Sequence, residues 1–145
     1  MKFVTRAAAA ATVMMGAALA LAGPSSADLL GPYVMNDDQS QRVLNGVLTP
    51  APNSSATWSM GPCRDGCLVI HSDAGWSSYA YLNNGRWEFS RDTVWNCPDG
   101  RRLPLTLSYS FDEASMTGTT RGFAPAGCEG FPITADGVTF TLTDI

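Results

Sequence analysis

The chain has 145 residues and a formal net charge of −4, which allows one domain and excludes a strongly basic nucleic-acid binder. Residues 28–145 hold seven Arg, no Lys and all 13 acidic residues, so their net charge is −6. An acidic surface of this kind repels phosphate backbones, and we expect no nucleic acid among the partners.

The first 27 residues have the three parts of a secretory signal peptide. Lys2 and Arg6 give a positive start, residues 7–22 form an apolar, Ala-rich run, and small residues at 25–27 form a cleavage site before Asp28. The apolar run is shorter than the roughly 20 residues that span a bilayer. We therefore expect residues 1–27 to be removed, leaving one secreted domain, 28–145, in the cell envelope or the medium, with no stable membrane anchor.

All four cysteines, Cys63, Cys67, Cys97 and Cys128, lie in the expected mature domain. An even number of Cys in a small exported protein predicts two disulfides rather than a metal site or free thiols. Three pairings are possible. The most economical one joins Cys63 to Cys67 as a local loop and Cys97 to Cys128 as a long-range link. The three residues between Cys63 and Cys67 do not match the two-residue spacing of thioredoxin-type redox motifs.

Alternation of apolar and polar residues after residue 27 indicates β-strands, while 39–44 is compatible with one helical turn. Residues 67–70 form a short apolar run, and turns are expected at 98–100 and 112–115. The alternating apolar positions are Leu103, Leu105, Leu107, Tyr109 and Phe111, and later Val138, Phe140 and Leu142. We expect an all-β fold: an antiparallel meander, curled into a small barrel or folded as a sandwich, and stapled by two disulfides.

The clearest hairpin signal is Asn84-Gly85 between two strand-like runs, 78–82 and 86–89. A two-residue turn there pairs Leu82 with Trp87 and Ala80 with Phe89 on one face, and leaves Tyr79 and Tyr81 on the other face beside Glu88. A three-residue turn that includes Asn83 shifts the register by one. It would place Tyr79, Tyr81, Trp87 and Phe89 together.

Aromatic residues are the remaining candidates for a binding surface. A small β-domain fills its core with Trp and Phe, and we expect Trp58, Trp87 and Phe89 to lie there. Trp76 and Trp95 are flanked by small and polar residues. Together with the outward-facing Tyr79 and Tyr81, they form the predicted binding patch, Trp76, Tyr79, Tyr81 and Trp95.

No pattern for catalysis, a metal or a cofactor stands out. His71 is the one histidine, Asp73 would share its strand face, and no Gly-x-Ser-x-Gly elbow accompanies them. The carboxylates show no ligand spacing for a metal and stand mostly at turn positions. We therefore expect no catalytic residue, no metal and no cofactor.

The segment 57–67, with the pattern Thr-Trp-Ser-Met-Gly-Pro-Cys-Arg-Asp-Gly-Cys, resembles small exported proteins of mycobacteria. So do Gly75-Trp76, the hairpin at 82–89, Cys97-Pro98-Asp99-Gly100 and residues 116–118 before Cys128. Similar modules occur as extracytoplasmic parts of membrane-anchored Ser/Thr kinases in those bacteria. The resemblance covers residues 57–128 and implies export, disulfides and β-structure, but no catalytic residue.

Three functions follow as expectations. The first is a secreted, non-enzymatic binding or interaction module with a protein partner, acting through the predicted binding patch. The second is a carrier for a small apolar ligand, with a lipocalin-like barrel whose interior would otherwise be filled by Trp87, Phe89, Leu105 and Leu107. The third is a cell-envelope hydrolase that uses His71 or a pair of carboxylates. A cavity distinguishes the carrier from the interaction module.

Overall fold

A computed structural model describes residues 26–145 of the chain, so most of the predicted signal peptide lies outside the described residues. A short 3-10 helix, η1 (Ser26–Leu29), precedes ten strands. The strands are β1 (Gly31–Asp38), β2 (Val43–Leu44), β3 (Val47–Leu48), β4 (Ser55–Pro62), β5 (Cys67–Ser72), β6 (Ser77–Asn83), β7 (Arg86–Asn96), β8 (Arg102–Asp112), β9 (Thr117–Ala124) and β10 (Ile133–Asp144). Within this part of the chain, no helix has the length and apolar character needed to span a membrane.

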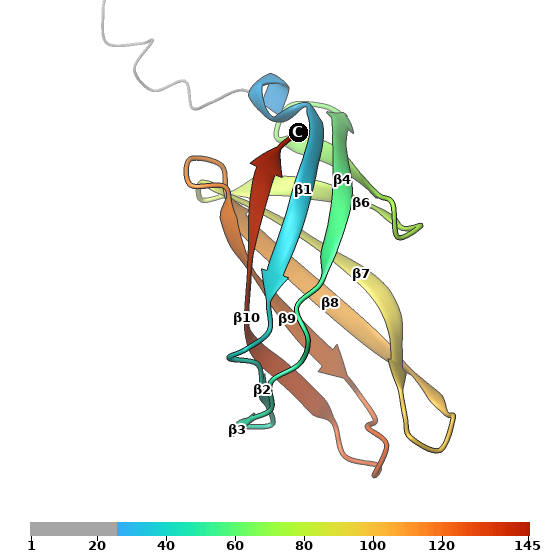
Figure 1. The fold of residues 1–145 in the computed structure, drawn as a ribbon. Helices are drawn as coiled ribbons and strands as arrows, with labels where there is room; N and C mark the ends of the chain where they lie inside the picture. Colours follow the sequence, from blue (N-terminus) through green and yellow to red (C-terminus); the bar gives the residue numbers. More distant parts are fainter. Residues whose placement is uncertain (1–25) are drawn as a thin grey trace, which may run out of the picture.

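Eight of the strands close into an antiparallel barrel. The order around the ring is β1-β4-β5-β6-β7-β8-β9-β10, and β10 pairs back onto β1 from Tyr33 opposite Asp144 to Asp38 opposite Thr139. Figure 1 shows β1 lying between β4 and β10. The prediction of an all-β meander is confirmed, and this closure makes it a barrel rather than a sandwich. The strands β2 and β3 form a small hairpin that extends β10 outside the ring.

The alternation seen in the sequence corresponds to the inner face of the barrel. Leu105, Tyr109 and Phe111 are buried along β8, and Val138 and Phe140 are buried along β10. Side chains along a strand point alternately to opposite faces, so one face of each strand supplies the interior. The predicted strands in these two regions are confirmed.

The β6–β7 turn has two residues. Asn84 and Gly85 both have positive φ, 50° and 78°, and Leu82 pairs with Trp87. Positive φ at both central positions is what a type I′ turn requires, and Asn and Gly tolerate it best. The three-residue alternative is therefore wrong.

A second Asn-Gly turn, Asn45-Gly46, joins β2 to β3 and was missed from the sequence because its strands have only two residues each. The segment 39–44, which the sequence left compatible with one helical turn, forms no helix. The backbone N–H of Arg42 donates to the Gln39 carbonyl at 3.2 Å, which closes a single turn, and Val43 then begins β2.

Aromatic rings fill the part of the barrel near η1 and the C-terminus. Trp58 is fully buried, and the ring centroids of Trp76, Phe89, Tyr109 and Phe140 lie 5.5–5.6 Å from its own. Such edge-to-face pairs add about 0.5–1.5 kcal/mol each beyond the area they bury. Trp87 and Phe89 are also buried, so the predicted core of Trp58, Trp87 and Phe89 is confirmed.

The inner face of β9 carries only small residues: Gly118, Thr120, Gly122 and Ala124. A Cβ atom at Gly118 would lie 2.5 Å from Cζ of Phe140 and 2.8 Å from Cβ of Phe111, so glycine there makes room for the aromatic core. At Gly122 the nearest side-chain atoms lie at 3.3–3.5 Å, and they belong to Ala135, Leu107 and Leu105. Glycine at both positions therefore lets side chains of the neighbouring strands pack closely against β9.

Both disulfides have the economical pairing expected from the sequence. Cys63–Cys67 closes the short loop before β5, and Cys97–Cys128 ties the β7–β8 turn to the long β9–β10 connection. The second link therefore holds two loops together at the barrel end opposite the C-terminus (Figure 1).

The two disulfides should contribute unequally to stability. A link stabilises mainly by shortening the unfolded chain, so we expect replacing the Cys97–Cys128 pair by Ser to cost roughly 3.5 kcal/mol and the Cys63–Cys67 pair roughly 2 kcal/mol. Chemical denaturation of the two double variants and the oxidised parent measures both losses. Equal losses would contradict the loop-length argument.

Candidate functional site

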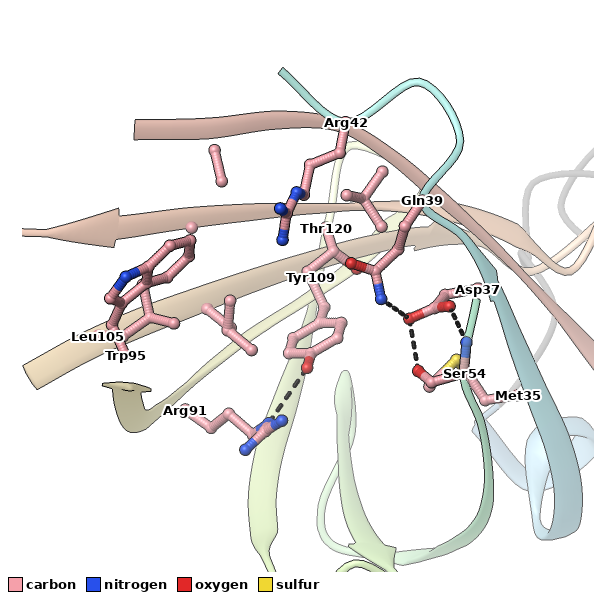
Figure 2. A pocket seen from close by; sticks show the side chains of 14 residues that line it. Met35, Asp37, Gln39, Arg42, Ser54, Arg91, Trp95, Leu105, Tyr109 and Thr120 are labelled. Carbon is pink, nitrogen blue, oxygen red and sulfur yellow. Dashed lines mark hydrogen bonds between the residues drawn. The ribbon is translucent and has the colours of Figure 1, made fainter. Parts of the chain in front are cut away.

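A cavity of about 260 Å³ opens at the barrel end where β2, β3 and the Cys97–Cys128 link lie. Figure 2 shows it from close by. Its lining residues are Met35, Asp37, Gln39, Arg42, Ser54, Arg91, Trp95, Leu105, Leu107, Tyr109, Thr120, Gly122, Ala135 and Val138. They come from β1, β7, β8, β9, β10 and the β1–β2 and β3–β4 connections, so the cavity is the unfilled part of the barrel interior.

The floor and walls are mainly apolar. Met35 and Tyr109 are buried and also belong to the aromatic core, so they separate the cavity from the filled part of the barrel. Leu105, Leu107 and Val138 form the walls on β8 and β10. Concave, mostly apolar pockets with a few placed polar groups are typical of small-molecule sites.

Arg91 brings a positive charge to this interior. It is two residues after Phe89 on β7, so it shares the inward face of that strand. Its Nε donates a hydrogen bond to the Tyr109 hydroxyl at 3.1 Å, and its guanidinium carbon lies 4.7 Å from the centroid of the Trp76 ring. The stacking and the hydrogen bond fix the guanidinium over the aromatic core.

Arg42 brings a second positive charge from the β1–β2 connection. Its Nε donates to the Thr49 carbonyl at 2.9 Å, and its guanidinium carbon lies 5.9 Å from the centroid of the Trp95 ring. In Figure 2 the Arg42 guanidinium is turned toward the space between Trp95 and Tyr109. The hydrogen bond to the Thr49 carbonyl and the contact with the Trp95 ring together hold the Arg42 guanidinium at the mouth of the cavity.

The one carboxylate in the lining, Asp37, is occupied by other donors. It accepts hydrogen bonds from the backbone N–H of Ser54 at 2.6 Å, from the Ser54 hydroxyl at 2.7 Å and from Gln39 Nε2 at 3.0 Å. Figure 2 shows this cluster on the β1 side of the cavity. Asp37 therefore anchors the connection that precedes β4 and leaves the formal charge of the lining at +1.

Burial raises the pKa of Tyr109 above its ordinary value, although the hydrogen bond from Arg91 acts in the opposite direction. The phenol therefore stays protonated at neutral pH. Because its oxygen accepts from Arg91, its own proton is free for an acceptor in the cavity.

A neighbouring groove of about 250 Å³ shares Trp95 with the cavity. It is lined by Leu44 on β2, by Phe131 in the long β9–β10 connection and by Ile133 at the start of β10. Phe131 is 69% exposed. The two hollows therefore adjoin at Trp95, and the groove also has the polar residues Asn45 and Glu129 in its lining.

The structure does not gather the four residues of the predicted binding patch. Tyr79 and Tyr81 lie on the outer face of β6, 59% and 48% exposed. Trp76 is partly buried against Trp58 in the core, and Trp95 lines the cavity. The expectation that Trp76 and Trp95 are exposed fails, because flanking Gly and Ser residues do not determine which face of a strand a residue takes.

His71 lies on an exposed strand face and shares a 2.6 Å hydrogen bond between its Nδ1 and the Ser77 hydroxyl. Asp73 instead accepts from the backbone N–H of Thr57 at 3.1 Å. Histidine and carboxylate are thus engaged separately. Among residues 26–145, no group of three His, Cys, Asp or Glu side chains is arranged to hold a metal ion.

Sequence reasoning missed the polar residues of the cavity. The signal for Arg91 was present, because it continues the alternation of Trp87 and Phe89 by one step. Asp37 likewise continues the inward positions Tyr33 and Met35 on β1, whereas Arg42 stands in a connection, where alternation carries no information. Comparison of the chain with family models, with curated proteins and with solved structures finds no match.

Tyr109 should make stability depend on pH in the alkaline range. A folded-state pKa raised by burial means that its contribution is fully present below the pKa of an unfolded tyrosine, about 10, and is lost as pH rises from there through the higher folded-state pKa. We expect the unfolding free energy to fall less steeply above pH 10 in Tyr109→Phe than in the parent. Tyr33, whose pKa burial also raises, is present in both proteins, so the difference reports Tyr109. Equal slopes in urea titrations at pH 9–11 would contradict this assignment.

Proposed function

We propose that this protein is a secreted, non-enzymatic binding protein that holds a small, largely apolar molecule in the open end of its barrel. The observation that carries the proposal is the cavity of about 260 Å³, which lies inside the closed sheet and has Leu and Val walls. Its volume is just below the roughly 300–1,000 Å³ of pockets that hold drug-sized molecules. A small ligand, or one whose end extends into the neighbouring groove, fits these dimensions.

Two features support a location outside the cytoplasm. The Cys63–Cys67 and Cys97–Cys128 disulfides suit an oxidising compartment. The charged start, apolar run and small-residue exit of residues 1–27 are those of a signal peptide. Resemblance of residues 57–128 to exported mycobacterial proteins supports the same proposal.

A matched pair of variants tests whether the cavity is the binding site. Thr120 lines the cavity, whereas Thr119 is exposed on the outer face of β9. We expect Thr120→Leu to fill the cavity and weaken the binding of the neutral fluorescent probe N-phenyl-1-naphthylamine at least tenfold. Thr119→Leu makes the same chemical change outside the barrel and should leave the affinity unchanged.

Fluorescence titration of the oxidised protein and both variants measures the effect. Native mass spectrometry of protein from its own culture then tests for a co-purifying molecule that is lost on denaturation. Failure of the parent to bind the probe, or equal weakening in both variants, would overturn the cavity as the site.

The outer face of β6 favours a second candidate, a surface for a protein partner. Tyr79 and Tyr81 are both exposed along this face, and Tyr81 pairs with Cys67 beside the Cys63–Cys67 loop. Exposed aromatic residues beside a rigid loop are typical of protein interfaces.

The second candidate predicts that Tyr79→Ser/Tyr81→Ser abolishes capture of a partner from the organism's envelope fraction and leaves probe binding unchanged. The matched control is Thr139→Ser, on the outer face of β10. Capture that persists in the double variant would exclude this strand as the interface.

A further inference from the structure

The cavity contains two guanidinium groups that form no ion pair with a carboxylate within residues 26–145. The ion pairs in this part of the chain are Arg101–Asp99 and Arg121–Asp136, and both lie outside the cavity. Asp37, the carboxylate in the lining, is engaged by Ser54 and Gln39. The interior is thus locally positive in a domain whose net charge is −6.

Each guanidinium uses only one of its nitrogens within the described chain. Arg91 donates through Nε to Tyr109, and Arg42 donates through Nε to the Thr49 carbonyl. A guanidinium has five N–H donors in a planar fork that matches the two oxygens of a carboxylate. The four N–H bonds on the Nη atoms of each arginine are therefore left for other acceptors.

The surroundings of the two arginines strengthen binding of an anion and hold the guanidinium donors in place. Arg91 is stacked on Trp76 and Arg42 lies over Trp95, so neither side chain has to be ordered when a ligand enters. Preorganised donors lose less entropy on binding. Partial burial beside Leu105 and Leu107 also lowers the local dielectric constant, which strengthens charge–charge attraction.

We propose that the ligand is an amphipathic organic anion, a carboxylate with an apolar body. Its carboxylate would lie at the polar side of the cavity, within reach of Arg42, Arg91 and the Tyr109 hydroxyl. Its apolar body would lie against Leu105, Leu107 and Val138 and continue past Trp95 into the groove. This inference rests on the proposed function, because it assigns the ligand class of the same cavity.

The direct test compares three molecules with the same ten-carbon tail and different head charges. Decanoate is an anion, 1-decanol is neutral, and decyltrimethylammonium is a cation. Each displaces N-phenyl-1-naphthylamine from the oxidised protein at pH 7, below its micelle concentration. We expect decanoate to bind at least about tenfold more tightly than decanol, a difference of about 1.4 kcal/mol, and the cation to bind most weakly.

Variants assign the preference to the two arginines. Arg42→Gln and Arg91→Gln should each remove most of the advantage of decanoate over decanol, which is measured as the ratio of the two affinities in the same variant. Arg42→Lys, which keeps the charge, should restore part of that advantage. The matched control is Arg121→Gln, an arginine that is exposed and ion-paired to Asp136, and it should change none of the three affinities.

The outcomes separate this inference from the proposed function. If the probe binds but decanoate and decanol bind equally, the cavity is a neutral apolar site and the inference is overturned. If both Gln variants keep the preference for decanoate, the two arginines do not carry it, and the inference is overturned as well. If neither the probe nor any ten-carbon molecule binds, both proposals fall. Because Arg91 also contacts the core, unchanged probe binding shows that its variant is folded, and Arg42→Gln gives the answer if it is not.

Discussion

The pairing of β10 with β1 is the constraint on which the rest of the molecule depends. Closure joins the first and last strands of the ring and removes both sheet edges, so all eight strands direct one face into a single interior. An eight-stranded barrel has an interior just wide enough for its own side chains or for one small ligand. What this barrel can hold is therefore decided by the sizes of the inward-facing residues.

Those sizes are distributed unevenly along the barrel. Around Trp58, large rings meet a glycine, Gly118, and the interior is filled. Toward the open end, Gly122 on β9 pairs with Leu107 on β8, and Thr120 and Gly122 line a cavity. The aromatic core therefore supplies rigidity at one end of the barrel, and small residues of β9 line the hollow at the other. The Cys97–Cys128 link keeps the loops of the hollow end together.

Much of this fold could be predicted from the sequence, because period-two alternation reports one face of a strand. Leu105 and Phe140 were identified in this way, and Asn84-Gly85 determined the hairpin register. Closure could not be predicted, because pairing between β1 and β10 joins segments more than 100 residues apart and no local pattern encodes it. Trp95 was predicted to lie in an exposed aromatic patch, but it lines the cavity, because it continues the alternation of inward-facing residues on β7 that includes Trp87 and Phe89.

The arginines of the cavity occupy positions where the surrounding barrel interior would favour apolar side chains. An inward position in a barrel of Trp, Phe and Leu favours an apolar side chain, and a charge there carries a desolvation cost unless it is paired. Arg91 has stacking and one neutral hydrogen bond instead of a carboxylate, although 13 acidic residues were available in the domain. Proteins depart from local consistency mainly at functional sites. The charge that the fold leaves unneutralised is therefore the strongest indication that the open end of the barrel binds a molecule of opposite charge.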